Sequence, residues 1–63
     1  MDDSEELALR LLTLAGAIME DASGVAIIGD NGIQLAERAA VVSRAAADAE
    51  LLANAAAIAL RRR

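Results

Sequence analysis

The chain has 63 residues, of which 57% are apolar, and a net charge of −4; this length suits one small domain over residues 1–63. It has no cysteine, histidine or aromatic residue, which excludes disulfides and removes the usual zinc ligands, so we expect no metal and no cofactor. The acidic balance argues against general affinity for nucleic acid. No apolar window approaches the ~20 residues that a membrane-spanning helix needs. With an acidic start unlike a secretory signal, the sequence predicts a cytoplasmic protein.

Alanine is the commonest residue, with seventeen copies against nine leucines and five isoleucines. An alanine core buries much less apolar area than a leucine core, so a chain this short gains little stability from folding alone. Small domains usually compensate with disulfides, a metal or association. Because the first two are missing, we expect self-association. Arginine as the only basic residue, with abundant alanine, is common in GC-rich bacterial sequences and suggests a bacterial origin.

The first predicted element is an amphipathic helix over about 4–28. Asp2 with Glu5, or Asp3 with Glu6, has the spacing of a capping box, and acidic residues suit the N-terminal end of a helix dipole. Apolar residues then recur every three or four positions, and Asp21 alone breaks one of the two apolar stripes. Asp21 is either exposed at the edge of that stripe or a buried contact that fixes the register of a dimer.

The segment from Ser23 to Gly32 allows two structures. In one, the helix continues to Ile28, Gly29 caps it, and Asn31 caps a second helix. In the other, residues 25–28 and 33–36 form a β-hairpin around Asn31-Gly32, giving an α-β-hairpin-α fold. The helical version is favoured because an isolated two-stranded hairpin is marginal in water and the seven-residue apolar repeat continues through this segment.

The second predicted helix covers about 33–61, antiparallel to the first. Its main stripe is almost continuous alanine, which allows close approach of another helix. If the chain folds back at residue 32, large residues face small ones, as Leu12 would face Ala53 and Met19 would face Ala46. The residues expected to pack within this helical hairpin are Leu12, Ala15, Met19, Val42, Ala46, Ala49 and Ala53.

The two helices carry more apolar stripes than one partner helix can cover. This predicts an all-α fold in which two hairpins form a dimeric four-helix bundle. In length and layout such a chain resembles the small plasmid-copy-number RNA-binding bundles; the resemblance is of architecture only, so no functional residue carries over. The residues expected at the dimer interface are Leu7, Leu11, Leu14, Ile18, Leu51 and Ile58.

No set of residues predicts catalysis. The serines have no histidine to activate them, and Asp30-Asn31-Gly32 lacks the remaining ligands of a calcium loop. Arg44 and Asp48 have the spacing of an exposed ion pair, and Arg61-Arg62-Arg63 complements the dipole of the second helix. The sequence therefore predicts a non-catalytic homo-oligomer that binds itself, or another helical protein, as an interaction or adaptor module. A nucleic-acid-binding regulatory bundle and an amphipathic membrane-surface protein are the two alternatives.

Overall fold

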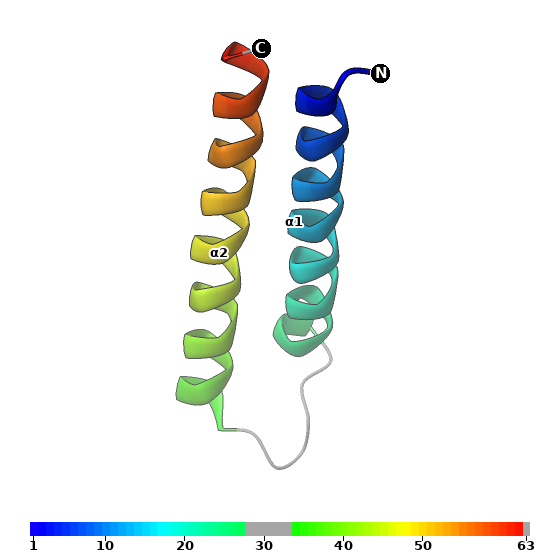
Figure 1. Cartoon of the computed structure of the whole chain (residues 1–63). Coiled ribbons are helices and arrows are strands. Elements are labelled where there is room, and N and C mark those ends of the chain that lie inside the picture. Colours follow the sequence, from blue (N-terminus) through cyan, green and yellow to red (C-terminus); the bar gives the residue numbers. More distant parts are fainter. Residues whose placement is uncertain (28–33, 63) are drawn as a thin grey trace.

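The computed structural model describes residues 1–27 and 34–62, which form two long helices, α1 (Asp3–Ile27) and α2 (Leu35–Arg61). They lie side by side and antiparallel, so that both termini are at the same end (Figure 1). The molecule is a rod of 46 × 16 × 11 Å. The predicted helical hairpin is confirmed. The β-hairpin alternative is wrong for residues 25–27 and 35–36, which are helical; the expected turn at Gly29–Gly32 lies outside the described residues.

The N-terminus of α1 is closed by one of the two capping boxes that the sequence allows. The Glu5 amide donates to Asp2 Oδ1 at 2.8 Å, and the Asp2 amide donates to Glu5 Oε1 at 3.2 Å. These reciprocal bonds satisfy two amides at the start of the helix, where backbone donors have no partner in the preceding turn. Asp3, Glu5 and Glu6 place negative charge in the first turn, where the helix dipole favours it.

The C-terminus of α1 is held by a side chain from α2. Arg38 donates from Nε to the Val25 carbonyl oxygen at 3.2 Å and from Nη2 to the Ala26 carbonyl oxygen at 2.9 Å. Carbonyls in the last turn of a helix have no partner within the helix, and a cation there complements the dipole. The last turn of α1 contains no basic residue of its own. Arg38 therefore supplies the missing cation from across the hairpin.

The start of α2 differs from the expected one. Its N-cap is Gln34, in an extended conformation with φ −70° and ψ 155° and without a side-chain capping bond, rather than Asn31. The helix begins at Leu35 instead of Ile33, and the Arg38 amide donates to the Gln34 carbonyl at 3.0 Å. Glu37 then lies in the first turn, where the dipole favours its charge. The start of α2 at Leu35 therefore places an acidic residue at the positive end of the helix dipole.

A continuous seam of buried and half-buried residues joins the helices. It repeats every seven residues, and all five buried residues in the described part of the chain are alanines: Ala8, Ala15 and Ala22 of α1, Ala49 and Ala56 of α2. Half-buried residues alternate with them, and all but two of these are larger than alanine. Because a methyl group projects little from the helix surface, alanine at these positions allows the two backbones to approach closely. The half-buried members of the seam are Leu11, Ile18 and Val25 in α1, and Val42, Ala45, Leu52 and Ala59 in α2.

The residues at the contact between the helices differ in part from those expected. Met19 and Ala46, which the expected pairing places opposite each other, line one groove between the helices. However, Leu12 and Met19 are 48% and 55% exposed and lie beside the seam rather than in it. Ala46 and Ala53 are also exposed, whereas Ala15 and Ala49 are buried and Val42 is half-buried. The buried positions of the seam are thus all alanines, and Leu12 and Met19 lie beside it.

Candidate interaction surface

Four large apolar side chains lie along one flank of the hairpin, which we call the leucine flank: Leu7, Leu14, Leu51 and Ile58. They are 50%, 51%, 68% and 45% exposed, respectively. Leu7 and Leu14 are separated by seven residues, as are Leu51 and Ile58, so each pair shares one face of its helix. The same seven-residue step leads from Leu14 to Asp21 and from Leu51 back to Arg44.

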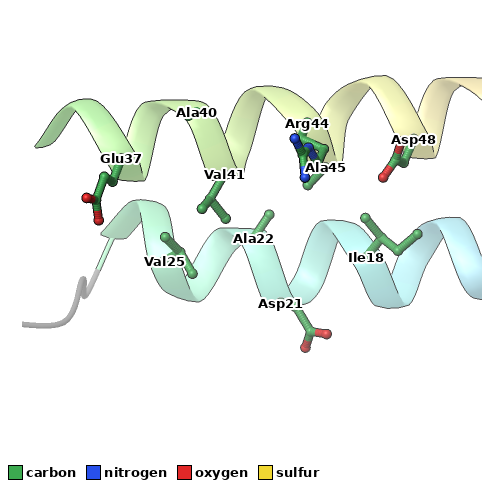
Figure 2. Close-up of a pocket in the computed structure, with 10 residues that line it drawn as sticks. All are labelled: Ile18, Asp21, Ala22, Val25, Glu37, Ala40, Val41, Arg44, Ala45 and Asp48. Carbon is green, nitrogen blue, oxygen red and sulfur yellow. The ribbon is translucent and has the colours of Figure 1, made fainter. Parts of the chain in front are cut away.

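An open groove between the helices continues the leucine flank toward the loop end of the hairpin (Figure 2). Its floor is apolar, with Val25 of α1 beside Val41 of α2 toward the loop end and Ile18 of α1 at the other end. Charged side chains border it, namely Asp21 of α1 and Glu37, Arg44 and Asp48 of α2. The flank thus has an apolar half near the termini and a charged half near the loop.

The charged half contains an arginine without an ion pair. In the part of the chain that the structure describes, the expected pair between Arg44 and Asp48 does not form, and the ion pair that does form joins Arg10 to Glu6 at 2.9 Å. The Asp21 side chain points away from α2 (Figure 2), which leaves it outside the seam. Asp21 is exposed in the single chain, which agrees with the first interpretation, an exposed position at the edge of the apolar stripe.

The opposite flank is apolar as well, but it is built differently. Leu12 and Met19 of α1 lie beside exposed alanines of α2, and a smaller groove lined by Met19, Ala26 and Ala46 runs between the helices there. Large apolar residues on this side come mainly from α1. The leucine flank, in contrast, has large apolar residues on both helices.

The residues expected at a dimer interface fall into two groups in the structure. Leu7, Leu14, Leu51 and Ile58 are exposed on the leucine flank and available to a partner. Leu11 and Ile18 are half-buried against α2 of their own chain. Sequence reasoning missed the contact of Arg38 with α1 altogether, because no local pattern shows that an arginine of one helix reaches the end of another.

The whole surface is larger than a compact chain of this size would have. The accessible area is 4803 Å², whereas a typical folded monomer of the same 6.5 kDa mass exposes about 3,800 Å². The excess of about 1,000 Å² is close to the roughly 800 Å² that each partner buries in a standard protein–protein interface.

Among the described residues there is no cluster of three or more side chains able to hold a metal ion. Within the same part of the chain, neither helix is long and apolar enough to cross a membrane. Comparison with known proteins gives no relative: no family model, no curated protein and no solved structure matches this chain. Any function must therefore be argued from the surface itself.

Proposed function

We propose that this chain is a non-catalytic interaction module that acts by self-association, with two hairpins forming a four-helix bundle through the leucine flank. The observation that carries the proposal is the exposure of Leu7, Leu14, Leu51 and Ile58 on one side of a hairpin whose buried residues are all alanine among those described. Exposed apolar side chains gathered on one side of a protein mark interaction sites. The excess surface area supports the same conclusion.

The first measurement is the mass in solution, by sedimentation equilibrium over a range of micromolar concentrations. A dimer supports the proposal. A monomer that remains folded across this range, as judged by far-ultraviolet circular dichroism, would refute it, because the leucine flank would then be stable in water.

A matched pair of substitutions tests the face. Leu14 lies on the leucine flank and is 51% exposed, whereas Leu9, in the same helix and 53% exposed, lies on the far side of α1 from the seam. About half of the Leu14 side chain is left for a partner to bury, which is worth roughly 1 kcal/mol per copy. Since a symmetric dimer buries it twice, Leu14→Glu should weaken dimerisation at least tenfold. Leu9→Glu should leave it unchanged; equal effects of the two variants would exclude this face.

A further inference from the structure

The leucine flank is arranged in three layers across the two helices. Because Asp21 and Arg44 line the same groove, they lie at similar heights on antiparallel helices. Moving seven residues toward the termini on each helix brings Leu14 level with Leu51, and a second such step brings Leu7 level with Ile58. Two layers are therefore apolar on both helices, and the third carries an acid on α1 and a base on α2.

This distribution distinguishes between the ways in which a second copy can approach. If both copies point in the same direction, α1 of each lies over α2 of the other, so every apolar layer meets its equivalent and each Asp21 meets the Arg44 of the second copy. If the copies point in opposite directions about an axis at that level, the leucine layers of the two copies lie at opposite ends and do not meet, while Asp21 meets Asp21 and Arg44 meets Arg44, which is repulsive. Arg44 is available for the first arrangement because it forms no ion pair with a described residue of its own chain.

We infer that the partner of the leucine flank is a second copy of this chain in parallel orientation, held in register by two crossed Asp21–Arg44 pairs. The inference rests on the proposed self-association and adds the orientation of the dimer and the residues that fix it. The two leucine layers provide the apolar contact, and the charged layer selects the orientation, as paired charges do at the edges of coiled coils.

Charge reversal tests the crossed pairs. In the parallel dimer, Asp21→Arg would place arginine opposite arginine in the charged layer, and Arg44→Asp would place acid opposite acid. Because like charges repel, each variant should raise the dissociation constant of the dimer about tenfold or more. The double variant Asp21→Arg with Arg44→Asp restores two crossed pairs and should return dimerisation to within about threefold of wild type. Glu20→Arg, the same charge change one position away on the outer side of α1, is the control and should have little effect. Circular dichroism checks that each variant is folded.

The orientation can also be measured on a chain with its flank intact. Because the chain has no cysteine, a spin label at Ala57→Cys is the only label. Ala57 is exposed and lies six residues before the last residue, Arg63. Ala57 lies thirteen residues beyond Arg44, which is roughly 20 Å along the helix at about 1.5 Å per residue, so the two labels lie about 39 Å further apart along the rod in an antiparallel dimer with its axis at the Arg44 level than in a parallel one. Pulsed electron paramagnetic resonance resolves this difference, and the short distance is expected.

The outcomes separate the two proposals. A wild-type monomer would refute self-association itself. A wild-type dimer with the long label distance would leave self-association standing and overturn the parallel orientation. A second pattern would also overturn the parallel orientation and leave self-association standing. In that pattern Arg44→Asp weakens the dimer, Asp21→Arg does not, and the double variant stays weak. It would indicate an antiparallel dimer in which Arg44 pairs with Asp48 of the second copy.

Discussion

The alanine seam makes the clearest prediction about stability, through the substitution Ala49→Leu. Ala49 is 5% exposed and lies on the seam between the two helices, so the three additional carbon atoms of leucine would need the helices to separate. Overpacking of this kind typically costs about 1–3 kcal/mol. A domain of this length has a total stability of roughly 3–9 kcal/mol, so the loss would be a large share of it.

The control is Ala47→Leu, because two positions along a helix point about 200° apart and Ala47 is exposed. Leucine and alanine have similar helix propensities, so a difference between the two variants reports packing rather than local helix formation. The assay is urea denaturation followed by circular dichroism, with all proteins at the same concentration, because the proposed dimerisation would make stability depend on concentration. If Ala49→Leu is as stable as Ala47→Leu, the helices are not closely packed at this point and the seam is misplaced.

Two further predictions concern single side chains. Arg38→Ala should cost about 1–2 kcal/mol in urea denaturation and speed amide hydrogen exchange in the last turn of α1, since it removes two hydrogen bonds to carbonyls there. As a control, Arg10→Ala removes only an exposed ion pair with Glu6 and should cost under about 0.5 kcal/mol. If the two variants lose the same free energy of unfolding, Arg38 does not cap α1. Leu12→Ala should cost about 1 kcal/mol, because the side chain is 48% exposed. Leu52→Ala, on the seam, should cost about 2–3 kcal/mol. If Leu12→Ala instead costs more stability than Leu52→Ala, then Leu12 belongs to the core.

Much of the hairpin follows from local rules that the sequence contains in full. The acids at the start of α1 fix its beginning through short-range hydrogen bonds, and Asp2 with Glu5 forms one of the two capping boxes that the spacing allows. The seven-residue repeat predicts the helical state of both segments. A fold-back near residue 32 brings Met19 toward Ala46, and the two line one groove. Local propensity also failed once, at Asn31, where a capping pattern did not mark the start of α2.

The tertiary structure decided which of several apolar stripes faces the partner helix. The sequence offers neighbouring stripes on each helix, and periodicity cannot rank them, because rotation of a helix by one position exchanges one stripe for the next. Packing selects the stripe with Ala8, Ala15 and Ala22, since small side chains allow the closest contact, and Leu12 and Met19 move to the side. The Arg38 cap likewise exists only once the hairpin has closed, because an arginine and the carbonyls that it binds lie twelve and thirteen residues apart in the chain. Residues close in the sequence thus determine where the helices form. The size of the side chains between the two helices determines which face of each helix makes the contact.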